Sequence, residues 1–281
     1  MLWKAFIMIG ISLFLVMFLT YDVAADPVYN WNFKPAENNE PPTTEPHYEK
    51  LLEKYGGFYK GPANEKNIYL TFDNGYENGY TEDVLDVLKE KNVPAAFFVT
   101  GHYISEEGEL IQRMVDEGHT VGNHSWHHPS LPEVSDERLK RELGEIDEYY
   151  QDLTGDKEGV KYVRPPRGTF NERTLRMIEE LGYTTIFWSF AYVDWNIDRQ
   201  KGADYAYHQI MRRVHPGAVM LLHSVSSDNA EALERVITDL ENDGYTFRSL
   251  DELAAKEDLV PFPFNWKFGI GGNLFVAAPT T

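Results

Sequence analysis

The chain has 281 residues and a formal net charge of −19, so it lacks the basic surface by which proteins bind nucleic acid. It has no cysteine, which excludes disulfides and cysteine-ligated metal sites. Its 42% hydrophobic and 25% charged residues are typical of a globular protein held together by core burial, and we interpret the acidic excess as a feature that favours solubility.

The first 25 residues contain the three parts of a secretory signal. Lys4 supplies a positive start, Ala5–Leu19 forms an apolar run, and Val23–Ala25 offers small residues at which a signal peptidase could cut. The run is about 15 residues long, shorter than the roughly 20 that cross a bilayer core. We therefore predict a cleaved signal peptide at residues 1–25, with an uncleaved anchor as the alternative. Either one places the rest of the chain outside the membrane.

Residues 26–65 lack hydrophobic periodicity and carry scattered prolines, so we predict an irregular arm that follows the surface and tethers the folded domain. A short helix is expected within this arm at Tyr48–Tyr55. The prolines of the arm are Pro27, Pro35, Pro41, Pro42, Pro46 and Pro62.

From residue 66 onward, apolar runs of strand length alternate with segments of helical period, as in a parallel sheet with crossover helices. The expected strands are Ile68–Phe72, Ala95–Val99, Thr120–Gly122, Tyr162–Val163, Thr184–Ser189, Ala218–Leu222 and Tyr245–Phe247. The expected helices are Thr81–Lys91, Glu106–Glu117, Ser135–Leu153, Asn171–Leu181, Asp204–Val214, Asn229–Asn242 and Leu250–Ala255.

These seven units predict an α/β fold: a distorted (β/α) barrel of about seven to eight units, forming a single catalytic domain at residues 66–255. An open, doubly wound sheet is the alternative. Residues 256–281 form a tail rich in Pro, Phe and Gly, to which the sequence assigns no role.

Reactive side chains follow five of the expected strands. Active sites of parallel α/β folds lie at the carboxyl ends of the strands, so these side chains can converge on one mouth. The five segments are Thr71–Gly75 with Asp73 and Asn74, His124–His128, Arg164–Gly168, Asp194–Trp195 and His223–Ser224.

Each of these residues also has a purely structural interpretation when it is taken alone. His124 and His128 could be hydrogen-bonded structural histidines, although their spacing suits two metal ligands on one loop. Asp73 could cap the next helix, Arg164 could belong to a rigid proline turn, and Asp194–Trp195 could form a surface turn. The common placement of the segments, rather than any single one, indicates an active site.

The five segments, in this order, resemble the five motifs of the polysaccharide deacetylase family, also described as the NodB homology domain or carbohydrate esterase family 4. The resemblance covers about residues 66–255. Within the family, TFDNGYENG at 71–79 and RPPRG at 164–168 most resemble the peptidoglycan N-acetylmuramic acid deacetylases that make muramic δ-lactam in the spore cortex. The resemblance implies a hydrolase of the amide bonds of N-acetylated cell-wall sugars.

The resemblance also implies a role for each residue that matches a catalytic position. Asp73 matches the base that activates water, and Arg164 matches the arginine that pairs with this base and orients it. His223 matches the acid that protonates the leaving amine, and Asp194 matches the carboxylate that holds this histidine. Positioned acid–base groups of this kind contribute roughly 10²–10⁴-fold each.

A metal site is implied by the same motifs. His124 and His128 match the two metal-binding histidines, and Asn74 stands where the family usually has a metal-binding aspartate. A divalent ion of the zinc type is therefore expected to be held weakly, because an amide oxygen is a poorer ligand than a carboxylate.

Three residues are expected to bind the substrate: Arg167, Gly168 and Trp195. Arg167 replaces a tyrosine that is usual in the third motif, and its planar guanidinium could pair with the lactyl carboxylate that only muramic acid carries. The oxyanion of the reaction could be stabilised by the metal or by a backbone N–H near Arg167 and Gly168.

The predicted function is hydrolytic N-deacetylation of peptidoglycan sugars, above all N-acetylmuramic acid, by a secreted, cell-wall-associated monomer. Its expected partner is the glycan strand, and membrane contact is expected only through an uncleaved segment 1–25. Three alternatives stay open: a deacetylase of N-acetylglucosamine polymers, a carbohydrate-binding relic in which Asn74 marks lost catalysis, and a glycoside hydrolase. A glycoside hydrolase would need two facing carboxylates. A carbohydrate-binding relic would have no reason to retain the full catalytic set, which consists of Asp73, Arg164, Asp194 and His223.

Overall fold

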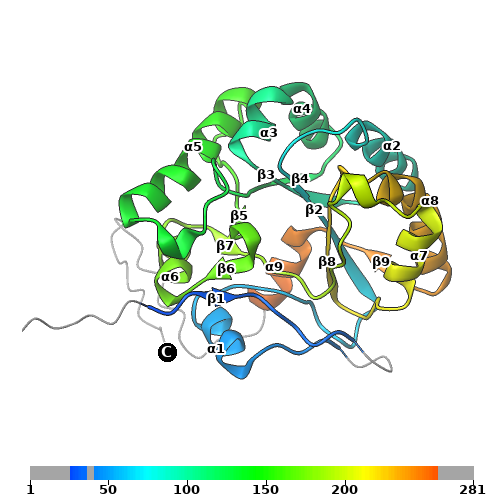
Figure 1. The fold of residues 1–281 in the computed structure, drawn as a ribbon, viewed down its shortest axis with the longest axis horizontal. Helices are drawn as coiled ribbons and strands as arrows, with labels where there is room; N and C mark the ends of the chain where they lie inside the picture. Colours follow the sequence, from blue (N-terminus) through cyan, green and yellow to red (C-terminus); the bar gives the residue numbers. More distant parts are fainter. Residues whose placement is uncertain (1–25, 37–40, 259–281) are drawn as a thin grey trace, which may run out of the picture.

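The structure is a computed structural model that describes residues 26–36 and 41–258 (Figure 1). The predicted signal peptide at 1–25 and nearly all of the predicted tail at 256–281 lie outside the described residues. Within the described part, no helix is both long enough and apolar enough to cross a membrane.

A curled sheet of seven parallel strands occupies the centre of the molecule, with helices around it (Figure 1). Its strands run in the order β7–β5–β4–β3–β2–β8, and β9 also pairs with β2. This half-barrel confirms the predicted α/β class and the distorted barrel in a single domain. The strands are β2 (Asn67–Asn74), β3 (Ala95–Val99), β4 (Thr120–Asn123), β5 (Tyr162–Val163), β7 (Thr184–Thr185), β8 (Ala218–Leu222) and β9 (Thr246–Phe247).

Helices cover the outer face of the sheet, with one exception. They are α1 (Pro46–Lys54), α2 (Thr81–Lys91), α3 (Gly101–Glu106), α4 (Gly108–Asp116), α5 (Asp136–Thr154), α6 (Glu172–Glu180), α7 (Ala203–Met211), α8 (Ser227–Asn242) and α9 (Leu250–Asp258). Helix α9 instead packs its Leu250 and Leu253 against Tyr69 in the interior cluster. The helix predicted at Glu106–Glu117 corresponds to α4, and the short helix α3 before it was not predicted. Glu107 separates the two helices, because its φ of −111° and ψ of 39° lie outside the helical region.

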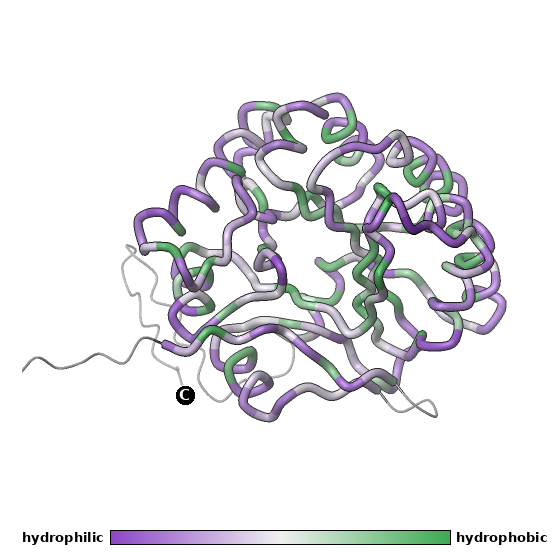
Figure 2. Tube along the Cα trace, in the orientation of Figure 1, coloured by the Kyte–Doolittle hydropathy of each residue, from purple (hydrophilic) through white to green (hydrophobic). Residues whose placement is uncertain are grey.

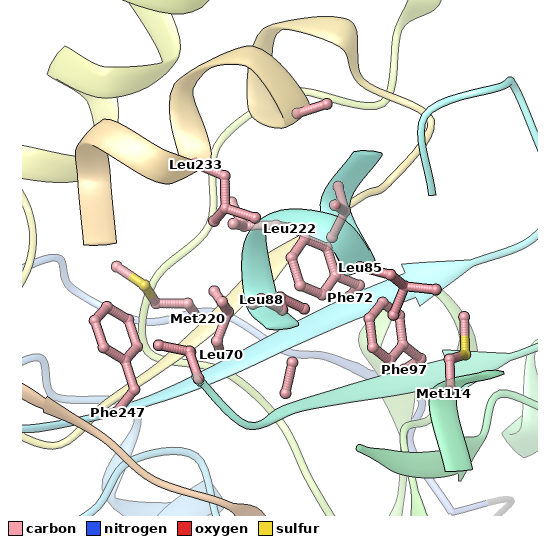
Figure 3. Packing of buried hydrophobic residues seen from close by; sticks show 14 of the residues in the cluster. Leu70, Phe72, Leu85, Leu88, Phe97, Met114, Met220, Leu222, Leu233 and Phe247 are labelled. Atoms are coloured by element: carbon pink, nitrogen blue, oxygen red, sulfur yellow. The ribbon is translucent and has the colours of Figure 1, made fainter. Parts of the chain in front are cut away.

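The helix-facing side of the sheet forms the main core. Phe72 of β2 stacks on Phe97 of β3, with ring centroids 5.1 Å apart. Figure 3 shows this pair among the side chains Leu70, Leu85, Leu88, Met220, Leu222 and Leu233. Hydrophobic residues run through the central strands, and the outer helices alternate between hydrophilic and hydrophobic residues (Figure 2). Removing one of these large side chains, as in Phe72→Ala, typically costs about 3–5 kcal/mol.

The interior-facing side of β2 carries polar groups toward the mouth of the barrel. Alternate residues of a strand point to opposite faces, and all eight residues of β2 are buried. Tyr69 therefore joins the interior cluster, and Thr71 and Asp73 continue the same row toward the carboxyl end of the strand. The strand period thus places a carboxylate at the edge where parallel folds have their active sites.

The barrel closes irregularly between β7 and β8. The predicted strand Thr184–Ser189 is wrong beyond Thr185, because Phe58 takes over the main-chain bonding there: Phe58 N donates to Thr185 O at 2.9 Å, and Phe187 N donates to Phe58 O at 2.7 Å. The isolated bridges that span the gap are Phe58 to Ile186, Lys60 to Ala218 and Phe190 to Met220.

Residues 26–36 also pack onto the barrel. Strand β1 (Tyr29–Asn30) pairs antiparallel with β6 (Thr169–Phe170), and Figure 1 shows the two side by side next to α1. Helix α1 lies where a short helix was expected. Together these elements bury a second apolar cluster that consists of Trp31, Leu51, Leu52, Tyr55, Tyr59, Phe170, Leu175 and Phe187.

Candidate active site

Asp73 and Arg164 form a buried ion pair at the mouth of the barrel. Arg164 Nη1 donates to Asp73 Oδ1 at 2.7 Å, and Arg164 Nη2 donates to Thr71 Oγ1 at 2.8 Å. The guanidinium is completely buried over the ring of Phe98, 4.2 Å from its centroid. Burial alone would raise the pKa of Asp73, but the Arg164 guanidinium outweighs it, together with the positive charge that His124 and His223 carry when protonated, and holds this pKa below its usual value. Asp73 is therefore an ionised carboxylate in one fixed orientation.

His223 and Asp194 form the second charge-coupled pair. His223 Nδ1 donates to Asp194 Oδ1 at 2.8 Å, and His223 N donates to Asp194 Oδ2 at 2.9 Å. Asn229, which the sequence did not single out, adds a third donor to this carboxylate at 2.6 Å. Burial would lower the pKa of His223, but the Asp194 carboxylate outweighs it and raises this pKa above its usual value. His223 can thus carry a proton on Nε2 while its Nδ1 is held.

His124 and His128 lie together on one loop, with ring centroids 4.8 Å apart. The carbonyl of Arg164 can only accept, so His124 Nδ1 donates to it at 2.8 Å and His124 Nε2 keeps a lone pair. That atom lies 3.5 Å from Asp73 Oδ2. Burial lowers the pKa of His124. Burial also lowers the pKa of His128, and the repulsion that a second proton would meet from a protonated His124 and from Arg167 brings this pKa to about 4. Both imidazoles are therefore neutral at pH 7, as metal ligands must be.

The third expected ligand, Asn74, has a side-chain oxygen without a partner. Asn74 Nδ2 donates to Ser224 Oγ at 2.8 Å, whereas the buried Oδ1 accepts no hydrogen bond. A buried acceptor is costly unless something satisfies it. Among residues 26–36 and 41–258, no three His, Cys, Asp or Glu side chains gather as a metal site. Two neutral imidazoles and an amide oxygen without a hydrogen bond are nevertheless donors of the kind that a divalent cation takes.

Glu142 of α5 supports the histidine loop, a role that the sequence analysis missed. Its buried carboxylate accepts from His127 N at 2.7 Å and from His127 Nδ1 at 3.1 Å, and its carbonyl accepts from Trp126 N at 2.9 Å. The loop needs such support because Ser125 and His128 both have left-handed φ, at 63° and 56°. A glutamate in the apolar stripe of α5, next to Leu143, was the available signal.

Seven of the ten expected residues line one pocket of about 530 Å³. Arg164, Asp194 and Asn74 do not line it and are at most 3% exposed, but Arg164 and Asp194 are bonded to the lining residues Asp73 and His223. The pocket also contains Tyr76 and Trp188, which the sequence did not single out. Its lining consists of Asp73, Gly75, Tyr76, His124, His128, Arg167, Gly168, Trp188, Trp195, Leu221, His223 and Val225. A second cavity of about 470 Å³ shares Gly75, Tyr76 and His128 with it.

The three residues expected to bind substrate all line this pocket. Trp195 is 55% exposed, and Arg167 is also exposed. Arg167 and Gly168 adopt left-handed φ of 58° and 66°. No ion pair formed within the described residues includes Arg167, although the chain is strongly acidic. The Gly168 N–H donates to Pro165 O at 3.0 Å and is therefore engaged within the turn.

Known proteins are similar to this chain in sequence and in fold. A family model described as polysaccharide deacetylase matches residues 60–186. The chain is 50% identical over 237 residues to the peptidoglycan-N-acetylmuramic acid deacetylase PdaA of Bacillus subtilis, covering 84% of this chain and 89% of that protein. It is 52% identical over 242 residues to an uncharacterized 30.6 kDa protein of Geobacillus stearothermophilus, covering 86% and 90%. The structure of Bacillus subtilis PdaA, a family 4 carbohydrate esterase, matches with a TM-score of 0.80 at 51% identity, covering 82% and 98%.

Proposed function

Because the chain belongs to the polysaccharide deacetylase family, we propose that it hydrolyses the N-acetyl amide of N-acetylmuramic acid in peptidoglycan. The observation that carries this proposal is the pair of charge-coupled residues at one pocket, Asp73 with Arg164 and His223 with Asp194. Amide hydrolysis needs an ionised base and a protonated acid at the same time. The two ion pairs favour those two states.

In the proposed mechanism, Asp73 takes a proton from the attacking water and His223 Nε2 gives a proton to the leaving amine. Arg164 keeps Asp73 ionised and oriented, and Asp194 does the same for the imidazolium of His223. Because the Gly168 N–H already donates to Pro165 O, the neighbouring N–H of Arg167 is the backbone donor that we propose for the oxyanion.

Deacetylases of this family generally depend on a metal ion. In this chain His124, His128 and Asn74 would hold it, and a divalent ion of the zinc type would supply Lewis-acid polarisation of the amide carbonyl. Two neutral imidazoles and one amide oxygen carry no negative charge, so we propose that the ion is bound weakly.

The proposed choice of muramic acid rests on Arg167. Its side chain lines the pocket, is exposed and has no carboxylate partner among the described residues. The lactyl carboxylate distinguishes muramic acid from glucosamine, and an arginine fork suits a carboxylate geometrically. Bacillus subtilis PdaA, which is half identical to this chain, carries muramic acid in its name. The alternatives of a glucosamine-specific deacetylase, a binding relic and a glycoside hydrolase are not favoured.

Peptidoglycan lies outside the cell membrane, so the proposed substrate fits an extracytoplasmic enzyme. We therefore retain as proposals a signal peptide at residues 1–25, with an uncleaved anchor as the alternative, and a catalytic domain at 66–255 that acts as a monomer. A part in muramic δ-lactam formation in the spore cortex is also a proposal, and it rests on the resemblance to enzymes of that branch.

Acetate release from purified wall glycans tests the proposed function. We expect the chain to release acetate from glycans that contain N-acetylmuramic acid, and mass spectrometry should locate the free amine on the muramic residue. Chitin oligomers, which have no lactyl group, serve as the matched comparison. A free amine found on glucosamine alone would replace the proposed substrate, and new reducing ends without acetate would indicate a glycoside hydrolase.

A further inference from the structure

Trp31, on the arm that precedes the barrel, is bonded to two walls of the pocket. Its backbone N donates to Gly168 O at 2.7 Å, and its side-chain Nε1 donates to Trp188 O at 2.9 Å. Gly168 and Trp188 both line the pocket and come from different segments. Trp31 itself is only 8% exposed. One residue far away in the sequence therefore ties together two lining segments.

The turn that carries Arg167 needs external support. Left-handed backbone is unfavourable for a residue with a side chain, and such residues persist where their surroundings fix them. Arg167 is one, at φ 58°. On the following side, Thr169 and Phe170 are held by pairing with Asn30 and Tyr29 of β1. The arm thus supplies the partner strand that anchors this turn.

Trp31 of the arm is packed closely against Gly168 of the turn. A methyl group added at Gly168 would come within 2.8 Å of Trp188 and 3.0 Å of the Cβ of Trp31. On its other side the Trp31 ring stacks on Phe187, with centroids 4.4 Å apart and planes at 14°. The turn is therefore packed closely against Trp31, which itself packs against Phe187 of the barrel.

We propose that Trp31 is a positioning residue for substrate choice: it holds the Gly168 and Trp188 walls together and so keeps the Arg167 side chain over the pocket. This inference rests on the proposed function, in which Arg167 pairs with the lactyl carboxylate. If Trp31 has this role, residues 26–36 contribute to the site and are more than a tether.

The test compares Trp31→Phe with Tyr55→Phe. Trp31→Phe keeps an aromatic ring against Phe187 but removes the donor to Trp188 O. Tyr55→Phe removes one hydrogen bond from the same apolar cluster, to Glu172 at 2.8 Å, away from the pocket. For Trp31→Phe we expect KM on muramic glycans to rise about three- to tenfold, the value of one hydrogen bond, with kcat little changed. For Tyr55→Phe we expect no such change, at a similar loss of thermal stability.

A double-variant cycle separates positioning from general damage. If Trp31 acts through Arg167, then Trp31→Phe should add little to the loss caused by Arg167→Ala. Fully additive losses, or equal losses on muramic and glucosamine substrates, would overturn the inference. Trp31→Tyr, whose side chain is larger than that of phenylalanine by a hydroxyl group, serves if the phenylalanine variant does not fold.

Hydrogen exchange gives a readout that does not depend on the substrate. Amides of residues 164–170 should exchange faster in Trp31→Phe than in the wild type, and should be unchanged in Tyr55→Phe. Unchanged exchange in both variants would overturn the positioning role even in an active enzyme. A different outcome would count against the proposed substrate instead: faster exchange in Trp31→Phe, together with an Arg167→Ala variant that has the same substrate preference as the wild type. Trp31 would then hold the turn in place without affecting substrate choice.

Discussion

Arg164 donates to Asp73 across 2.7 Å in the interior of the barrel, where the arginine has no exposed surface at all. Breaking a buried pair by removing one partner leaves an uncompensated charge and typically costs about 3–5 kcal/mol. The pair that keeps the base ionised is therefore also part of what holds the mouth of the barrel together.

Asp73→Asn should lower kcat by roughly 10²–10⁴-fold, because the amide cannot accept the proton of water. It should also lower thermal stability, since Arg164 loses its counter-charge. Acetate release measured below the melting temperature of the variant, together with a thermal melt, separates the two effects. A folded variant with near wild-type turnover would mean that another residue is the base.

Asp194→Asn should move the alkaline limb of the kcat profile to lower pH. His223 must be protonated to act as an acid, and Asp194 raises its pKa, so the carboxylate extends activity toward higher pH. Without this charge the burial of His223 dominates, its pKa falls, and the proton is lost earlier as pH rises. Rates across the pH range on one muramic substrate check this, and an unmoved limb would show that His223 is not the acid.

Asn74→Asp should tighten the binding of zinc or cobalt, because it adds a negative ligand beside two neutral imidazoles. Ser224 can follow the change, since its hydroxyl can donate where it now accepts. The wild type should leave purification without a stoichiometric ion and respond to added divalent ions. Calorimetric titration of both proteins tests this, and tight zinc in the wild type that survives mild chelation contradicts it.

Glu142→Gln should weaken the binding of the same ions by about 10- to 100-fold, the range for groups that orient metal ligands. The amide keeps the shape of the side chain but loses the charge that holds His127 N and Nδ1. Glu145→Gln, on the exposed side of the same helix, is the matched control. Equal affinities in the two variants would leave Glu142 with a purely structural role.

Arg167→Ala should lower kcat/KM on muramic glycans by about ten- to a hundred-and-fifty-fold, which corresponds to the 1.5–3 kcal/mol of a charge-assisted hydrogen bond. Arg167→Lys should restore only part of this loss, because a point charge cannot make the paired contact. Arg167→Gly removes the side chain and also relaxes the left-handed backbone. Glucosamine oligomers should be affected far less, and equal losses on both substrates would make Arg167 a catalytic or structural residue.

The sequence was sufficient to predict the position of a site residue where a local pattern determines that position. The alternation along β2 placed Asp73 at a strand end, and the ends of parallel strands necessarily gather at one edge. His124, Arg164 and His223 follow from the same rule. Asp194 follows it less directly, since a loop brings it to His223, and its part was implied only by the family resemblance.

The sequence was insufficient to predict strand pairing and side-chain burial where contacts between distant segments determine them. Nothing near Thr184–Ser189 shows that Phe58 will replace a neighbouring strand there. The pairing of Tyr29 with Phe170 depends likewise on a surface that exists only after the barrel has formed. Glu142 looked like one more charge on an acidic helix until its burial was known.

The irregular closure between β7 and β8 also affects the order in which parts of the molecule can fold. Lys60 bridges Ala218, and Phe58 bridges Ile186. The segment at residues 58–60 can therefore form these pairings only after residues 186 and 218, much later in the sequence, are present. In a chain that emerges amino terminus first, the barrel cannot be completed before β8 is available. Such distant pairings slow folding. Closure between β7 and β8 is therefore a late event in synthesis, because residues 58–60 can bridge Ala218 only after β8 has been made.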